Sequence, residues 1–375
     1  MTIRAVSGAG LAAGVALLAY PGFVHAAALE NAVPQPVRLL YEDGTYGEIG
    51  LVYVDPHQSG DDATDPTSGL TFSGNTGDVF NSRTHVGAAL KGDINDRLSY
   101  LLVLDQPYAV DTSYGPGSFP GGFPYDGTTA KVQTYQLTGV LAYDLNDRVK
   151  GYAGLRAERL DAKATIPFIA DYSIDAGENW GYGYLAGVAY ARQEIGLRVS
   201  LTYFSGIDHS LDSDEFSTAT GAQSTQTDID TPQSATLDFQ TGLNPKTLLF
   251  GSVRWTDWSD FSIEPPVYTQ VTDRPLVDYQ DDWWTYTLGL GRQFTDDLAG
   301  SFFVSYEPSV GGTMTSLGPY DGRSTATAAL SYDYERFNFL GALSYGVLGD
   351  THNLLDTDYN DGSILGMSLR VGYNF

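Results

Sequence analysis

The stretch 363–375 reads SILGMSLRVGYNF, and its residues alternate between two kinds. Every second residue back from Phe375 is apolar: Tyr373, Val371, Leu369, Met367 and Leu365. The residues between them are small or polar: Asn374, Gly372, Arg370, Ser368 and Gly366. A period of two is typical of a β-strand with two unlike faces. In a soluble sandwich the apolar face points into a core, whereas in a transmembrane barrel it points into lipid.

The composition of the chain bears on the choice between a soluble sandwich and a transmembrane barrel. Its 375 residues include 43 Gly and 26 Tyr but only 3 Met and no Cys. The mean hydropathy is −0.18. Beyond the N-terminus, no apolar run reaches the roughly 20 residues that a transmembrane helix needs. The length alone is compatible with one large barrel or with two soluble domains.

The net charge of −26 argues against nucleic acid as a partner, because its phosphates would be repelled. Much of the acid lies in stretches such as SGDDATD (59–65) and HSLDSDEF (209–216). We interpret these stretches as solvated loops. The alternative is that their carboxylates bind divalent cations shared with anionic outer-membrane lipids and lipopolysaccharide.

The N-terminus has the features of a secretory signal peptide. Arg4 precedes an apolar stretch that ends at Leu18, and small residues follow around Ala26. We predict a signal peptide over residues 1–26, cut after Ala26. A membrane anchor is the weaker alternative, since the apolar stretch is short and rich in Gly.

Alternating segments like the last one recur along the chain and number about 14. They are residues 46–55, 83–90, 98–104, 132–143, 149–160, 180–191, 195–204, 234–243, 247–255, 283–294, 298–307, 325–334, 337–346 and 363–375. Closed bacterial barrels have an even number of strands. Most segments have about the 9–11 residues of a tilted membrane strand.

The connections between these segments alternate in length. Short turns alternate with long loops, among them Asp105–Lys131, Asp161–Asn179, Ser205–Pro232 and Ser259–Asp281. Outer-membrane barrels are built this way, with short periplasmic turns and long external loops. The sequence therefore predicts an all-β fold, a 14-stranded antiparallel transmembrane β-barrel over residues 46–375. Residues 27–45 precede it as a short plug segment. The last strand should close the barrel against the first.

Three stretches resemble the FadL-type family of outer-membrane transporters for long-chain fatty acids and other hydrophobic compounds. They are TYGEIGLVYVDPHQSG (45–60), ENWGYGYLAGVAY (178–190) and LLFGSVRWTDWSDF (248–261). The resemblance implies passive transport: external loops capture the substrate, the lumen holds it, and it leaves through a lateral gap in the wall. It also implies an N-terminal hatch with the motif Asn-Pro-Ala. Here Gln35-Pro36-Val37 stands in that place and the plug segment is short.

A fatty acid needs a cation for its carboxylate, and Arg is suited to that role in a low-dielectric lumen. Strand parity turns Arg83, Arg156, Arg198, Arg254 and Arg370 inward. The resemblance assigns carboxylate binding to Arg156, and Arg198 and Arg254 are further candidates. The family's partner Lys is missing, because DYQDDWW (278–284) offers none. The alternative is that these arginines pair with lumenal Glu48, Glu158 or Asp238 and hold the structure together.

The hydrocarbon tail needs an apolar surface, and the stretch TIPFIADY (165–172) is unusually apolar for an external loop. We predict that Ile166, Phe168 and Ile169 form one wall of a capture groove. Phe119 and Phe123, with Tyr114 and Tyr125, are candidates for a second wall. The alternative is that these loops fold inward and pack on the barrel.

Catalytic and metal-binding patterns are weak in this sequence. Beyond the predicted signal peptide there are only four histidines, no Cys and no GxSxG motif. The best cluster, His209 with Asp208 and Asp212, lies in an acidic stretch. We therefore expect neither an enzyme nor a cofactor or metal site.

These observations predict a monomeric outer-membrane channel for passive uptake of long-chain fatty acids or similar hydrophobic molecules. A general porin-like channel for small polar solutes is the alternative, which the short plug favours. A structural or adhesive barrel is a third reading.

Overall fold

The computed structural model describes residues 29–31, 36–65, 68–115 and 124–375. The predicted signal peptide, the first plug residues, Phe119 and Phe123 lie outside the described residues. Within the described ranges, no helix is both long and apolar enough to span a bilayer.

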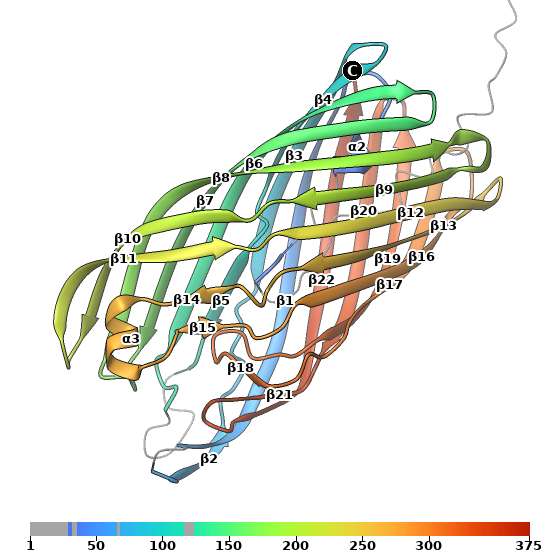
Figure 1. Cartoon of the computed structure of the whole chain (residues 1–375). Helices are drawn as coiled ribbons and strands as arrows, with labels where there is room; N and C mark the ends of the chain where they lie inside the picture. Colours follow the sequence, from blue (N-terminus) through green and yellow to red (C-terminus); the bar gives the residue numbers. More distant parts are fainter. Residues whose placement is uncertain (1–28, 32–35, 66–67, 116–123) are drawn as a thin grey trace, which may run out of the picture.

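Fourteen antiparallel strands form a closed barrel in the described part of the chain, as the alternating segments predict (Figure 1). In chain order they are β1 (Tyr46–Thr64), β3 (Arg83–Asn95), β4 (Leu98–Asp105), β6 (Thr129–Asn146), β7 (Val149–Ile166), β8 (Tyr172–Arg192), β9 (Leu197–Phe204) continued by β10 (Ile207–Ser217), β11 (Gly221–Thr231) continued by β12 (Ser234–Asn244), β13 (Thr247–Thr256), β16 (Trp283–Gln293), β17 (Leu298–Glu307), β19 (Arg323–Tyr334), β20 (Phe337–Leu348) and β22 (Asp358–Asn374).

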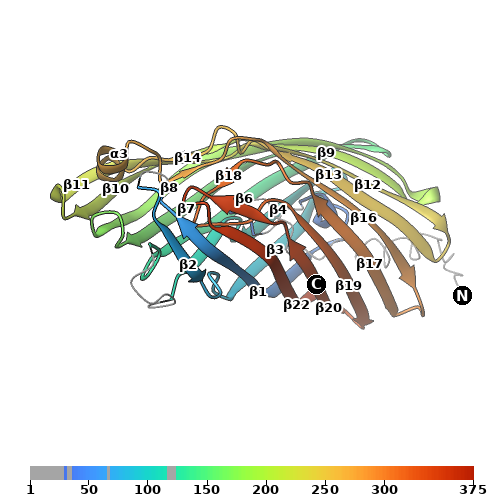
Figure 2. The same ribbon diagram turned by 90° about the horizontal axis from the view of Figure 1, so that it is seen from below.

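The terminal strand closes the barrel. β22 pairs with β1 along most of its length, for example Leu369 with Leu51, and pairs on its other edge with β20 (Figure 2). Closure satisfies the backbone hydrogen bonds of both edge strands, which a bilayer cannot do. The role predicted for residues 363–375 is therefore confirmed.

The two faces of each strand differ as the alternation predicts. Leu369 is 67% exposed and Leu155 is 75% exposed, whereas Ser368 and Arg156 on the other parity are buried. Aromatic side chains such as Tyr143, Tyr306 and Tyr345 are exposed on the outer face. An apolar outer band with aromatic rings suits a lipid environment.

Shorter elements lie between the wall strands. They are α2 (Pro36–Leu39), β2 (Thr71–Asn75), β5 (Ala109–Ser113), the 3-10 helix Gln193–Ile195, β14 (Ser262–Ile263), α3 (Pro266–Thr272), β15 (Val277–Asp278), β18 (Thr313–Met314) and β21 (Thr351–Asn353). Figure 1 shows α3, β14, β15, β18, β21 and β2 at the end opposite to the C-terminus, while α2 lies near the end that carries the C-terminus.

Two predicted long loops prove to be extended sheet. β7 and β8 continue to a five-residue turn at 167–171, and β10 pairs with β11 from Ile207 to Ser217. The outward positions of this second hairpin carry aspartates, which is why the sequence reads as a loop. Its inward positions, such as Leu211 and Ile229, are buried. The hairpins therefore extend the barrel wall at its loop end.

Candidate ligand site in the barrel lumen

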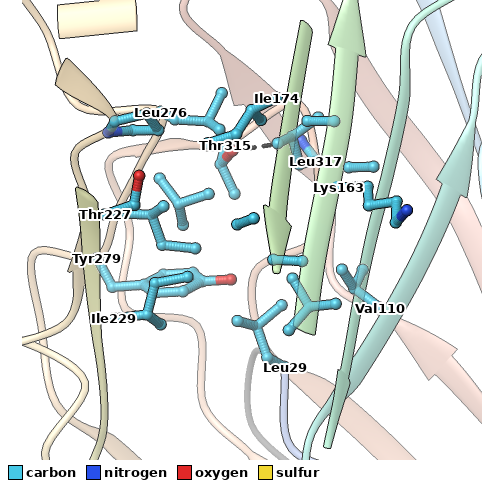
Figure 3. A pocket seen from close by; sticks show the side chains of 18 residues that line it. Leu29, Val110, Lys163, Ile174, Thr227, Ile229, Leu276, Tyr279, Thr315 and Leu317 are labelled. Atoms are coloured by element: carbon cyan, nitrogen blue, oxygen red, sulfur yellow. Dashed lines mark hydrogen bonds between the residues drawn. The ribbon is translucent and has the colours of Figure 1, made fainter. Parts of the chain in front are cut away.

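An apolar pocket lies inside the loop end of the barrel (Figure 3). It encloses about 530 Å³ of space not filled by atoms, part of it open to solvent. Apart from Lys163, the eighteen side chains that line it carry no formal charge. Lys163 pairs with Asp175 at 2.7 Å, and this hydrogen bond raises the pKa of its amine. Figure 3 shows the Lys163 side chain directed away from the other lining residues. The pocket itself is therefore suited to uncharged hydrocarbon.

The wall side of the pocket follows from strand parity. Ala162 and Ala164 on β7, Ile174 and Ala176 on β8, and Ile229 on β11 all point inward. All five lie in stretches that the sequence marks as loops, and alternation within those stretches is the signal that could have revealed them. Small alanines on adjacent strands leave room that larger side chains would fill.

The opposite side of the pocket comes from the connection between β13 and β16, which folds over the lumen. It contributes Ile263, Leu276, Val277 and Tyr279. Burial raises the pKa of Tyr279, so this phenol stays neutral. Sequence reasoning missed this wall, because its apolar residues are scattered in an acid-rich loop.

A single carboxylate on the barrel wall holds this connection. Glu215 on β10 accepts hydrogen bonds from the Val267 backbone N–H at 3.1 Å and from the Tyr172 hydroxyl at 2.8 Å. It also accepts one from the Thr225 hydroxyl at 2.6 Å. Since Glu215 is buried, these donors replace the water that would otherwise bond to its carboxyl oxygens.

The third side of the pocket is the N-terminal segment Leu29–Asn31. The Asn31 N–H donates to the Pro107 carbonyl at 2.7 Å, and the Ala109 N–H donates to the Leu29 carbonyl at 3.0 Å. Buried Glu30 pairs with buried Arg254 on β13. The segment therefore crosses the lumen and joins two sides of the wall.

Residues 38–45 lie at the other end of the lumen. Leu39 and Leu40 pack in a buried cluster with wall residues such as Leu101 and Phe204. The Lys91 ammonium donates to the carbonyls of Glu42 and Gly44 at 2.7 and 3.0 Å. Burial raises the pKa of Glu42 to about 7, against the opposing effect of Arg38. The described part of the plug segment is thus bonded to the lumen wall at both of its ends.

The predicted arginines face inward, and most are engaged by the protein. Arg254 donates to Glu30 and to the Thr236 hydroxyl, the latter at 3.0 Å. The Arg198 guanidinium lies 3.7 Å from the Tyr41 ring centroid, and Arg370 pairs with Glu48 at 3.5 Å. The structural pairing considered for these arginines is present for Arg370, while Glu30 is a partner that the sequence did not suggest.

Arg156 forms no ion pair with a described residue, in contrast to Arg254 and Arg370. It is 3% exposed, and it donates to the Gln136 side chain at 3.0 Å and to the Ser205 carbonyl at 2.8 Å. Glu158 pairs instead with His209, whose Nε2 lies 3.2 Å from the carboxylate. Arg156 lines neither the apolar pocket nor the cavity described below. Ligand binding by Arg156 stays a prediction.

The predicted capture residues are at the β7–β8 turn. Ile166 and Ile169 pack against the buried apolar cluster that contains pocket residues such as Ile174 and Leu317, while Phe168 is 48% exposed. None of the three lines the apolar pocket. Of the candidates for a second wall, Tyr114 and Tyr125 are buried and stack at 4.9 Å between ring centroids. The structure therefore separates an outer apolar turn from the inner pocket.

The wall has a seam between β8 and β10. β8 pairs with β10 at Ser173–Ala176 and with β9 at Leu185–Arg192, and no strand register joins residues 177–184 to 205–212. Gly181 and Gly183 lie in this seam, with the side chain of Ile207 packed on them. A Cβ atom on Gly181 would lie 2.4 Å from Ile207 Cγ2, so only glycine permits this close approach. At the edge of the seam the Ser205 N–H still donates to the Tyr184 carbonyl at 2.9 Å. Between residues 177–183 and 206–212, side chains rather than strand hydrogen bonds close the wall.

The family described as "Outer membrane protein transport protein (OMPP1/FadL/TodX)" matches residues 5–336. No curated protein matches the chain. The structure is similar to a Pseudomonas aeruginosa FadL homologue, with a TM-score of 0.76 and 16% identity over 91% of this chain and 93% of that one.

Two further similar structures are toluene transporters. The P. putida transporter TodX has a TM-score of 0.64 and 13% identity, over 90% of this chain and 91% of that one. The Ralstonia pickettii transporter TbuX has a TM-score of 0.65 and 13% identity, over 94% and 97%. At these identities the likeness shows the fold alone. The match over residues 5–336, on a 14-stranded barrel with a lipid-facing apolar band, shows that the chain belongs to the OMPP1/FadL/TodX family of outer-membrane transport proteins.

Proposed function

We propose that this barrel carries small hydrophobic molecules, long-chain fatty acids among them, passively across the outer membrane. The observation that carries the proposal is the apolar pocket between the folded-in loops and the segment Leu29–Asn31. Hydrocarbon enters such a pocket because apolar surface is removed from water. Because β22 closes on β1 within one chain, a single chain completes the barrel, and we propose a monomer as the working unit.

The contents of the lumen argue for this function over a porin for polar solutes. A porin needs a continuous aqueous path. Here a buried apolar cluster fills the loop end, and residues 38–45 are bonded across the other end. The similar structures named above include toluene transporters, so small aromatic hydrocarbons are also candidate substrates.

The proposed route has three stages. The exposed Phe168 turn captures the molecule, the apolar pocket holds it, and the seam between β8 and β10 releases it sideways. Release at the seam requires the side chains of Ile207 and His209 to move away from Gly181, because they close the wall there. No strand hydrogen bonds between residues 177–183 and 206–212 need to break for this to happen.

Filling the pocket tests the proposal. Ala164→Trp places an indole at a buried pocket position, whereas Thr165→Trp places the same side chain on the exposed face of the same strand. Uptake of oleate and of toluene into cells should fall at least about tenfold in the first variant and stay unchanged in the second. A parent barrel that passes small sugars freely, with oleate uptake indifferent to Ala164→Trp, would favour the porin instead.

Two further variants test the first and last stages. Phe168→Asp puts a charge on the proposed capture surface and should lower oleate uptake while leaving the barrel folded. The pair Gly183→Cys with Ser205→Cys joins the seam, since a Cβ on Gly183 would lie 2.7 Å from the Ser205 Oγ. Oxidation should stop uptake and reduction should restore it. The control pair, Thr327→Cys with Ser344→Cys, crosses a regular ladder between β19 and β20 and should not affect uptake. Full uptake through the oxidised seam would refute lateral release.

A further inference from the structure

A second cavity adjoins the apolar pocket. It holds about 450 Å³ of space not filled by atoms, part of it open to solvent. Leu29 and Val110 line both cavities, so these two side chains stand between them. The second cavity differs in that its lining includes Glu30, Arg83 and Arg323. It therefore combines charge with the apolar surface of residues such as Phe80 and Ile364.

The charges around this second cavity do not cancel. Glu30 pairs with Arg254, and Arg323 pairs with Glu307 at 2.8 Å. The remaining cation, Arg83, forms no ion pair with a described residue. Its Nε donates to the neutral side chain of Asn31 at 3.1 Å.

The acidic group that acts on Arg83 from a distance is Asp111, and it has other partners. Lys131 Nζ lies 3.7 Å from the Asp111 carboxylate, and the Asn81 amide donates to the same carboxylate at 2.6 Å. One positive charge is thus left over in a largely enclosed, partly apolar cavity. An arginine in such a place binds a carboxylate strongly and in a fixed orientation.

We propose that Arg83 binds the carboxylate of a hydrophobic monocarboxylic acid, whose hydrocarbon chain passes Leu29 and Val110 into the apolar pocket. This inference rests on the proposed function and names its substrate class: an acid is bound in preference to an alcohol or hydrocarbon of the same length. The segment Leu29–Asn31 contributes to both halves of the site. Leu29 lies beside the path of the ligand's hydrocarbon chain, and Asn31 accepts a hydrogen bond from Arg83.

Arg83 fits this role better than Arg156, the residue to which the family resemblance assigns it. Arg83 lines a cavity that adjoins the hydrocarbon pocket, whereas Arg156 lines neither cavity. Two nitrogens of the Arg156 guanidinium already donate to the protein, and its guanidinium lies 5.5 Å from the Phe204 ring centroid. A ligand at Arg156 would have to displace these contacts.

The test compares two ligands on the full mature chain in phospholipid nanodiscs. Decanoate and decanol are titrated by calorimetry against the parent protein, Arg83→Gln, Arg156→Gln and the exposed control Arg292→Gln. In Arg83→Gln the affinity for decanoate should fall at least about tenfold, which corresponds to about 1.4 kcal/mol. The affinity for decanol should change less than about twofold, since its chain lies in the apolar pocket. The other two variants should keep the parent's preference for the acid.

The outcomes separate the two proposals. If the parent binds neither ligand, the proposed hydrophobic transport fails. If it binds both equally, or if Arg83→Gln keeps the preference while Arg156→Gln loses it, the Arg83 site is refuted and the transport proposal stands. Arg83→Lys retains the charge and should keep part of the preference.

A measurement on the parent protein covers the case in which Arg83→Gln does not fold. A crystal structure with 10-bromodecanoate should place the bromine among Ile229, Leu276 and Tyr279, and the carboxylate within hydrogen-bond distance of Arg83. Bromine beside Arg83, or a carboxylate at Arg156, would overturn the inference.

Discussion

The ion pair between Glu30 and Arg254 is the interaction whose loss we expect to matter most for the N-terminal segment. Both side chains are buried, at 4% and 3% exposure. Glu30→Gln keeps the shape of the side chain and one acceptor oxygen, but it removes the carboxylate charge that pairs with the enclosed Arg254, which also donates to the Thr236 hydroxyl. Removing one partner of a buried pair costs about 3–5 kcal/mol.

This cost should fall on the segment rather than on the barrel. Two backbone hydrogen bonds join Leu29 and Asn31 to the wall, and each contributes about 0.5–1.5 kcal/mol. The loss of the pair is at least as large as both together. The barrel strands keep their ladders in either case, so we expect Leu29–Asn31 to leave the lumen while the wall stays folded.

Hydrogen exchange measures this locally. The amides of Asn31 and Ala109 make the two backbone bonds, and their protection should fall by about two to three orders of magnitude in Glu30→Gln. Glu178→Gln is the matched control, because its pair with Arg159, at 2.7 Å, is exposed and such pairs contribute about 0–1 kcal/mol. Unchanged protection of Asn31 and Ala109 in Glu30→Gln would refute the reasoning.

Three other predictions test the lipid face, the topology and the plug. Leu369→Arg should lower the free energy of unfolding in lipid by about 2–4 kcal/mol, and Leu145→Arg, next to a short turn, by about 0–1; equal costs would contradict the membrane placement. Because the chain has no Cys, single introduced cysteines report topology. On intact cells an impermeant thiol reagent should label cysteines at Asp212 and Asp358. It should not label cysteines at Asp96, Asn146 and Asp297. The pKa of Glu42, about 7 in the folded protein against an ordinary 4.5, means that the protonated form favours the packed segment. That contribution is present below pH 4.5 and is lost as the pH rises through 7. Exchange protection of residues 38–45 should fall over this range in the parent and stay level in Glu42→Gln, and a parallel fall in both would exclude Glu42 as the cause.

The sequence by itself determined the part of the wall that the fourteen alternating segments form. The alternation in residues 363–375 recurs in thirteen other segments, and all fourteen are strands with the predicted faces outward. Alternation is a local property, because successive side chains on any strand point to opposite sides. Every wall strand has lipid on one side and the lumen on the other. The alternation within a single segment is therefore enough to predict which of its side chains face lipid and which face the lumen.

The tertiary structure decided what fills the lumen. Residues 205–232 read as an acidic loop but form wall strands, because their inward side chains are buried by the connection between β13 and β16. The partner of Arg254 is Glu30, which lies far away in the sequence. The pocket likewise brings Leu29, Ala164 and Tyr279 together from three distant segments. Parity shows which side chains enter the lumen, but which of them meet depends on how the loops fold into it, and no local pattern encodes those long-range contacts.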